Sequence, residues 1–254
     1  MIVSALRTLQ VLQAFNTPPY RLGLAEVIER LGIERNQAYR SLKTLEAAGF
    51  IVQGDDARFE PGPVITSLAS TAARFRSSSL VDVARPHLDA IAEMTHESVH
   101  LFVRSGDRAV LIDRRESPQS VRLVSLLGRS LPLHAGATPK AMLAWLPPEE
   151  QRTIIASVTA LPAYTPLTVR DPLALERELD AIRVQGYAVS DGDFDAEARG
   201  AGAAIFGRDG SVVGGVSVGG PSFRIDDTRL AWFATIARDA AQAISHDLAL
   251  AADG

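Results

Sequence analysis

The sequence predicts an α+β protein with an N-terminal winged helix-turn-helix domain, followed by a larger domain that mixes helices and strands. A length of 254 residues suggests two domains, at roughly 100–200 residues each. The first 62 residues have the order helix, helix, tight turn, helix, hairpin. The later residues mix helical and strand patterns without strict alternation. We expect domains at 1–62 and 81–254, with a linker helix over 63–80.

Composition excludes several classes of protein. A hydrophobic share of 46% is enough for a packed core, which argues against general disorder. The absence of cysteine excludes disulfides and thiolate metal sites and fits a reducing compartment. The chain start lacks the pattern of a signal peptide, and no run approaches the ~20 apolar residues of a membrane span. We therefore expect a cytoplasmic protein with no membrane contact.

Net charge gives little support for a nucleic-acid partner. The total is −4, and residues 1–62 hold seven basic and seven acidic side chains. A DNA-binding function must therefore depend on where the charges lie rather than on their sum.

Apolar residues at helical spacing predict three helices in the first domain, over about 3–15, 24–31 and 34–48. Gly32 separates the second helix from the third, and Gly49 ends the third. Apolar residues on both sides of a polar turn then predict a small β-hairpin. The pattern is typical of a helix-turn-helix followed by a wing.

The third helix has one apolar and one polar face. At 100° per residue, Ala38, Leu42 and Leu45 share the apolar face. The polar face carries cations, amides and a phenol, which reach phosphates and base edges when a helix enters the major groove. For the helix alone, a merely solvated polar face is the alternative. The candidate DNA-binding residues, including one on the hairpin, are Arg35, Asn36, Gln37, Tyr39, Arg40, Lys43 and Arg58.

The second domain reads as helices and antiparallel strands around a central sheet. We expect helices over about 81–94, 137–146, 149–157, 172–185 and 226–251. We expect strands over about 99–103, 109–113, 121–126, 187–189, 203–206 and 212–218.

Two short motifs suggest a hydrolase. His96 to His100 matches H-E-x-x-H, which needs a helix so that both histidines reach one zinc ion. Here the motif runs into a strand pattern, which would separate the histidines by ~13 Å. Ser217 matches a G-x-S-x-G elbow, but no helix begins after it. A hydrolase using zinc at His96 and His100, or Ser217 as nucleophile, remains the alternative; we expect no enzyme, metal site or cofactor.

Longer segments resemble the IclR family of bacterial regulators over nearly the whole chain. The N-terminal ones are SALRTLQVLQAF, LAEVIERLGIERNQAYRSLKTLEAAGFIV and DDARFEPGP. The later ones are LPLHAGATPKAMLAWLP, ELDAIRVQGYAVSDGD and AAIFGRDGSVVGGVSVGGPSFRI. The resemblance implies a transcriptional repressor or activator with a GAF-like effector-binding domain, controlled by a small organic-acid or aromatic metabolite. Pro139, Ser190, Glu197 and Gly200 depart from the family pattern, which leaves the effector open.

The resemblance also implies a position for the effector pocket. Hydroxyl and backbone N–H groups in such a cleft hold a carboxylate, while apolar walls bury the rest of the ligand. Several positions are small, so we expect a ligand larger than a two- or three-carbon acid. The alternative is that the glycines and serines only serve tight strand packing. The candidate pocket residues are Leu126, Ala137, Thr138, Met142, Ser190, Gly200, Ala203, Ser217 and Gly219.

The size of the first domain predicts self-association. One such module buries only roughly 600–1,000 Å² on DNA, so two linked copies gain through effective concentration. The first helix has more apolar residues than one side needs, namely Leu6, Leu9, Val11, Leu12 and Phe15. The resemblance likewise implies pairing through the DNA-binding domains. We expect a homodimer or homotetramer on a pseudo-palindromic double-stranded DNA operator, with half-sites about 10 bp apart.

Overall fold

The computed structural model describes residues 2–16, 19–74 and 80–251, and the chain divides into two compact units, 1–77 and 78–254. Each unit has its own core and is described by itself. None of the helices in these described ranges is long and apolar enough to cross a membrane.

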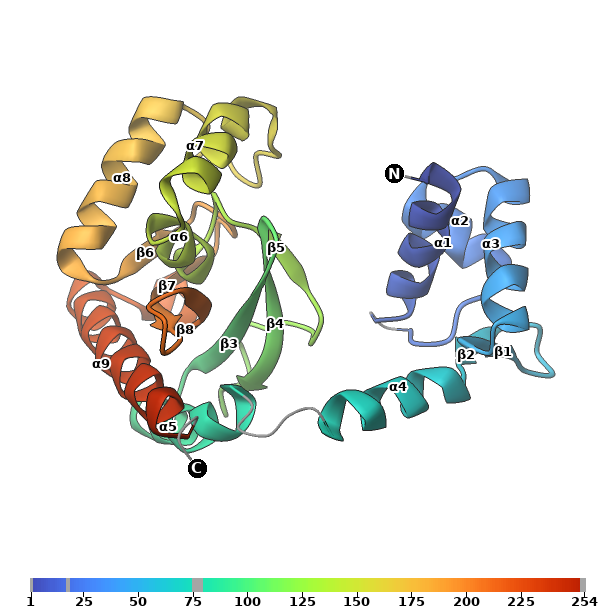
Figure 1. The fold of residues 1–254 in the computed structure, drawn as a ribbon, viewed down its shortest axis with the longest axis horizontal. Helices are drawn as coiled ribbons and strands as arrows, with labels where there is room; N and C mark the ends of the chain where they lie inside the picture. The colour runs from blue at the N-terminus through green and yellow to red at the C-terminus, as the bar shows by residue number, and fades with distance from the viewer. Residues whose placement is uncertain (1, 17–18, 75–79, 252–254) are drawn as a thin grey trace. The chain divides into compact units, whose positions relative to one another are not determined.

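The first unit is a winged helix-turn-helix (Figure 1). Its elements are α1 (Val3–Gln13), η1 (Ala14–Asn16), α2 (Leu24–Leu31), α3 (Arg35–Ala47), β1 (Ile51–Gln53), β2 (Phe59–Pro61) and α4 (Pro63–Arg74). Gly32 makes the turn between α2 and α3 in the left-handed conformation, at φ 60°, which costs glycine little. Buried residues of α1, α2, α3 and both strands, among them Val11, Val27, Leu42 and Phe59, form one core.

Backbone contacts hold the wing of this unit in place. Leu22 and Phe59 exchange two backbone hydrogen bonds of 2.9 Å, so that the segment before α2 joins the hairpin. At the hairpin base, a Cβ atom on Gly62 would lie 2.5 Å from the carbonyl oxygen of Gly49. Within the range expected for a linker helix, 63–80, α4 ends at Arg74 and Leu80 is the first residue of α5; residues 75–79 lie outside the described residues.

The second unit is an α+β domain built on one antiparallel sheet with strand order β5-β4-β3-β8-β7-β6. Its strands are β3 (Ser98–Ser105), β4 (Arg108–Arg115), β5 (Ser130–Pro132), β6 (Ala188–Asp191), β7 (Ala198–Phe206) and β8 (Val212–Pro221). Its helices are α5 (Leu80–Thr95), α6 (Ala137–Ala144), α7 (Pro148–Ser157), α8 (Pro172–Gln185) and α9 (Asp227–Ala251), with short turns η2 (Val158–Ala160) and η3 (Ser222–Arg224). This architecture confirms the predicted fold class.

Helices cover both faces of the sheet (Figure 1). Alternate residues of each strand point to opposite faces, as the pleat requires. Leu101, Ala203 and Val216 pack with α5 and α9 in one cluster. Phe102 and Ala204 pack with α6, α7 and α8 in the other. The domain therefore has three layers, and the face toward α6 is the one that carries the candidate site.

The strand expected over 121–126 is wrong, since that segment is irregular and the edge strand is β5 instead. Three of its carbonyl groups, those of Val121, Leu123 and Ser125, accept hydrogen bonds from side chains and not from a neighbouring strand. Ser98 donates to the carbonyl of Leu123 at 2.9 Å, and Arg224 donates to that of Val121 at 3.0 Å. The alternating apolar pattern therefore had no strand partner to pair with.

A buried ion-pair network fixes α6 against its surroundings. The Lys140 ammonium, only 3% exposed, lies 2.7 Å from Asp193 and 2.6 Å from Glu178 of α8. Burial alone lowers the pKa of Lys140, but the two carboxylates raise it above its ordinary value. Burial alone raises the pKa of Asp193, but Lys140 holds it below its ordinary value. Both groups are therefore charged at neutral pH.

Removing the charge of Lys140 tests this network. We expect Lys140→Met to lower the free energy of unfolding of the second unit by about 3–5 kcal/mol, because it leaves the buried carboxylate of Asp193 without its cation. Urea denaturation at pH 7 measures the loss. Lys43→Met is the matched control, since Lys43 is half-exposed and pairs with Glu46 at the surface of the first unit. A loss below about 1 kcal/mol for Lys140→Met would contradict the prediction.

Candidate DNA-binding face and ligand cavity

The structure separates the two faces of α3 as the helical pattern predicts. Ala38, Leu42 and Leu45 are buried in the core of the first unit, together with Ser41. On the outer face, Gln37 is half-buried and Tyr39 exposes 52% of its surface to solvent. Exposing an aromatic ring to this extent has no benefit for packing. The fully exposed polar side chains of this face are Arg35, Asn36 and Arg40.

Two of the candidate DNA-binding cations, Lys43 and Arg58, form ion pairs with carboxylates of the same unit. The Lys43 ammonium lies 2.7 Å from Glu46 and 5.5 Å from the centre of the Phe59 ring. The guanidinium of Arg58 lies 2.7 Å from Glu26, which also accepts a 2.6 Å hydrogen bond from the amide at the start of α2. The Arg58–Glu26 pair ties the wing to α2, whereas the Lys43–Glu46 pair lies within α3. Lys43 and Arg58 must exchange or share their carboxylates in order to reach a phosphate.

Arg35 and Arg40 differ from Lys43 and Arg58. Within the described residues, neither makes an ion pair or a side-chain hydrogen bond, and both are exposed. Arg21, which the sequence analysis did not select, pairs with Asp56 at 3.1 Å and Glu60 at 2.8 Å. The exposed face of α3 thus carries two cations, Arg35 and Arg40, that have no carboxylate partner among the described residues.

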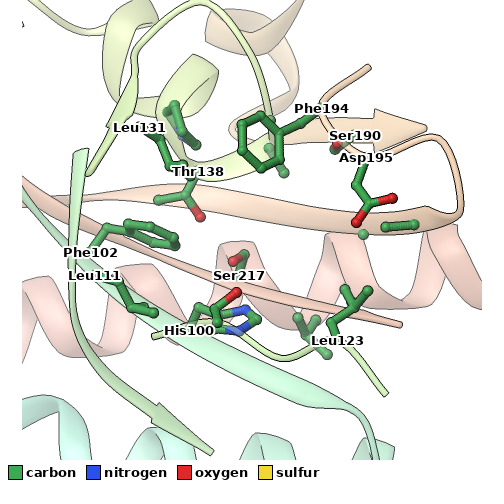
Figure 2. A pocket seen from close by; sticks show the side chains of 18 of the residues that line it. His100, Phe102, Leu111, Leu123, Leu131, Thr138, Ser190, Phe194, Asp195 and Ser217 are labelled. Carbon is green, nitrogen blue, oxygen red and sulfur yellow. The ribbon is translucent and has the colours of Figure 1, made fainter. Parts of the chain in front are cut away.

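The second unit contains a cavity of about 140 Å³ between the sheet and the start of α6 (Figure 2). Strands β3, β7 and β8 form its floor. Six of the nine candidate pocket residues line it, namely Ala137, Thr138, Ser190, Gly200, Ser217 and Gly219. The structure therefore brings together residues that are up to 82 positions apart in the sequence.

The other three candidates lie elsewhere. Ala203 is on β7 but points to the opposite face of the sheet, toward α5 and α9. Met142 lies one turn further along α6, fully buried in the core that α6 shares with α7 and α8. Leu126 is in the turn before β5, where its carbonyl accepts the amide of Arg129. Ala203 lies three positions after Gly200 on the same strand, and residues an odd number apart face opposite sides of a sheet. For this reason Gly200 lines the cavity and Ala203 does not.

The start of α6 presents unpaired hydrogen-bond donors to the cavity. The Gly136 amide donates to Asp193 at 3.2 Å, and Pro139 has no amide hydrogen. Within the described residues, nothing accepts from the amides of Ala137 and Thr138. The Thr138 hydroxyl is also buried without a partner, and it points into the cavity (Figure 2). Pro139 therefore removes no hydrogen bond from the helix, because an amide in the first turn has no acceptor within the helix.

Two glycines allow α6 to approach the sheet so closely. A Cβ atom on Gly202 would lie 2.8 Å from the Thr138 hydroxyl, and one on Gly215 would lie 2.5 Å from the Thr138 methyl. Two other glycines allow β7 and β8 to pack closely against each other. A Cβ atom on Gly200 would lie 2.8 Å from the carbonyl of Val218, and one on Gly219 would lie 2.9 Å from that of Arg199.

Several residues that line the cavity were not predicted from the sequence. His100, Phe102 and Leu123 contribute walls, and Phe194 and Arg129 lie at the edge of the cavity. The guanidinium of Arg129 lies 5.0 Å from the centre of the Phe194 ring, and Arg129 makes no ion pair in the described part of the chain. His100 and Phe102 are alternate residues of β3, so they lie on one face of the sheet. They could be predicted to line the cavity only after it was known which face of β3 is turned toward α6.

The two hydrolase motifs do not have the geometry that their chemistry requires. Helix α5 ends at Thr95, and His96 has a left-handed φ of 55°, so the H-E-x-x-H segment is not helical. Glu97 is 1% exposed and binds Arg224 through contacts of 2.6 and 2.8 Å. Ser217 lies within β8, where it pairs in register with His100 and with Gly202 of β7. There is no sharp turn at the serine.

Comparison with known proteins agrees with these observations. The family model described as "IclR helix-turn-helix domain" matches residues 4–55, and the model described as "Bacterial transcriptional regulator IclR C-terminal" matches residues 72–246. The HTH-type transcriptional regulator Rv1719 of Mycobacterium tuberculosis is 36% identical over 219 residues, which cover 86% of this chain and 78% of the relative.

Solved structures give the same result. The crystal structure of the Thermotoga maritima IclR superposes with a TM-score of 0.73 at 30% identity, covering 98% of this chain and 100% of that one. An IclR homolog from Microbacterium hydrocarbonoxydans complexed with 4-hydroxybenzoate superposes with a TM-score of 0.76 at 25% identity, covering 96% and 98%. These matches give no support to the hydrolase alternative. The chain belongs to the IclR family of bacterial regulators and is a DNA-binding transcriptional regulator, not an enzyme.

Proposed function

We propose that this regulator is controlled by a small organic acid that binds in the cavity of the second unit. The observation that carries this proposal is the buried Thr138 hydroxyl, which is 1% exposed and without a partner beside two unpaired amides of α6. A buried donor without an acceptor costs about 1–3 kcal/mol. A carboxylate would supply acceptors to all three donors, and the positive end of the helix dipole favours its charge.

Size and charge narrow the ligand class to a ring-bearing monocarboxylate. The cavity of about 140 Å³ is close to the ~150 Å³ that accepts benzene in an engineered protein core. Phe102, Leu111 and Leu131 provide apolar walls for such a ring. Arg129, at the edge of the cavity and without an ion pair among the described residues, attracts an anion to the entrance. The 4-hydroxybenzoate bound by the Microbacterium hydrocarbonoxydans homolog is an acid of this class.

We further propose that the protein acts in the cytoplasm as a dimer or tetramer on a pseudo-palindromic operator. Helix α1 supports pairing, since Val11 and Phe15 fill the core of the first unit while other apolar residues face solvent. Leu6 and Leu9 are 39% and 55% exposed, and Val3 is 63% exposed. A second copy of the chain would cover this stripe. Two linked modules would also compensate for the absence of net positive charge.

The recognition helix gives the first functional prediction. Arg35→Ala and Arg40→Ala should each weaken binding to an operator selected from random duplex DNA by about 1–3 kcal/mol, because each removes a free cation. Lys43→Ala and Arg58→Ala should cost less, since Glu46 and Glu26 partly neutralise these charges.

Fluorescence anisotropy measures the operator affinities. Arg152→Ala, which removes an equal charge from the surface of the second unit, is the control for net charge. Wild-type affinity for both the Arg35 and Arg40 variants would exclude α3 as the reading helix.

The cavity gives the second functional prediction. Benzoate should raise the melting temperature of the protein, and benzamide, its neutral analogue, should not. Thr138→Val keeps the side-chain shape and removes the unpaired hydroxyl. We expect it to leave the ligand-free protein as stable as the wild type or more so, and to weaken benzoate binding about tenfold or more.

Isothermal titration calorimetry gives the affinities, with Thr153→Val on the outer face of α7 as the matched control. If no ring acid binds at millimolar concentration, or if Thr138→Val binds benzoate like the wild type, the proposed ligand site is wrong.

A further inference from the structure

His100 is a polar side chain of the cavity that the proposed carboxylate site does not use. It lies on β3 and faces the same side of the sheet as α6 (Figure 2). It is 8% exposed, and neither ring nitrogen has a hydrogen-bond partner among the described residues. Its ring nitrogens are not enclosed by protein atoms, since His100 lines the cavity and neither nitrogen is among the fully buried polar atoms that lack a partner. A ligand group in the cavity can therefore hydrogen-bond to this ring.

The register places His100 away from the start of α6. Thr138 rests on Gly202 of β7 and Gly215 of β8, whereas His100 lies on β3, on the far side of β8. Neighbouring strands are about 4.8 Å apart, so roughly 7 Å across the sheet separates the two positions. A carboxylate held by α6 does not reach His100, but the opposite side of a six-membered ring does.

The surroundings of His100 select the kind of group that it can bind. Burial, and then the nearby charges of Arg114 and Arg129, lower the pKa of His100 to about 4. The ring is therefore neutral at pH 7 and offers one donor and one acceptor. Phe102 and Leu111 line the same part of the cavity, and neither side chain can hydrogen-bond. A hydroxyl group, which both donates and accepts, satisfies such an imidazole better than a second carboxylate does.

We propose that His100 is a specificity-determining residue that hydrogen-bonds a hydroxyl group on the ring of the effector, away from its carboxylate. The inference rests on the proposed ligand site and adds the substrate class: hydroxylated ring acids in preference to unsubstituted or methylated ones. Ser217 pairs in register with His100 on the neighbouring strand, so its hydroxyl lies between the two ends of the ligand.

Matched ligands and matched variants test this assignment. The ligand pairs are 4-hydroxybenzoate with 4-methylbenzoate and 3-hydroxybenzoate with 3-methylbenzoate, which differ in hydrogen bonding but little in size. The variants are His100→Phe, which keeps an aromatic ring without polar atoms, and His100→Asn, which keeps a donor and an acceptor. Calorimetric titration at pH 7 gives the affinity of each combination, and thermal melting checks that each variant folds.

In the wild type we expect the better hydroxy acid to bind about tenfold or more tightly than its methyl partner. His100→Phe should abolish this preference while changing the affinity for the methyl acid less than about threefold, and His100→Asn should retain part of it. Thr138→Val provides the contrast, since it should weaken both members of a pair equally.

Equal binding of hydroxy and methyl acids to the wild type overturns the assignment of His100 but leaves the proposed function intact. A preference that survives in His100→Phe overturns it as well. If His100→Phe does not fold, the wild-type preference and His100→Asn decide the question. If none of the four acids nor benzoate binds to the wild type, the proposed ligand site itself is wrong, and this inference fails with it.

Discussion

A Cβ atom at Gly202 or Gly215 would collide with Thr138, and the second unit depends on the close contact that these two glycines permit. Helix α6 begins directly on the backbone of β7 and β8 and not above a layer of side chains. This contact buries the Thr138 hydroxyl and directs the first amides of the helix toward the sheet floor. A longer side chain at either glycine would fill the space beneath the helix and separate the donors from the cavity.

The buried charges behind α6 explain how this position is maintained. Asp193 binds Lys140 in the helix, the amide of Gly136 before it, and the hydroxyl of Ser190 on β6. The same short loop carries Phe194, which lies against Arg129 at the edge of the cavity. The Asp193 carboxylate therefore holds together the start of α6, β6 and the loop that carries Phe194. An ion pair of this kind is costly to break, and it leaves little freedom for the donors at the start of α6.

Helices and strands were predicted correctly from the sequence where their ends depend on local interactions. Helix α8 is observed over its expected range because Asp171 accepts the amide of Ala174 at its start, Pro172 occupies the first turn, and Gly186 ends it at φ 81°. The expected strand over 121–126 is wrong because distant side chains such as Arg224 take its carbonyl groups. His100 was missed as a cavity residue because its face is set by pairing with β8, more than 110 positions later. Pairing at that distance leaves no local signal in the sequence.

The distribution of charge in the first unit connects the fold to its regulation. Arg21, Lys43 and Arg58 each pair with a carboxylate of the same unit, and the Arg21 and Arg58 pairs hold the wing against the segment before α2 and against α2 itself. Stability of the first unit therefore competes with attraction to phosphate. A unit with seven basic and seven acidic residues up to position 62 has little non-specific affinity for DNA. In the dimer or tetramer proposed above, affinity would come from two correctly spaced copies that read two half-sites. Such an assembly would be sensitive to small changes in spacing, because the loss of one half-site would leave a single module that holds DNA weakly.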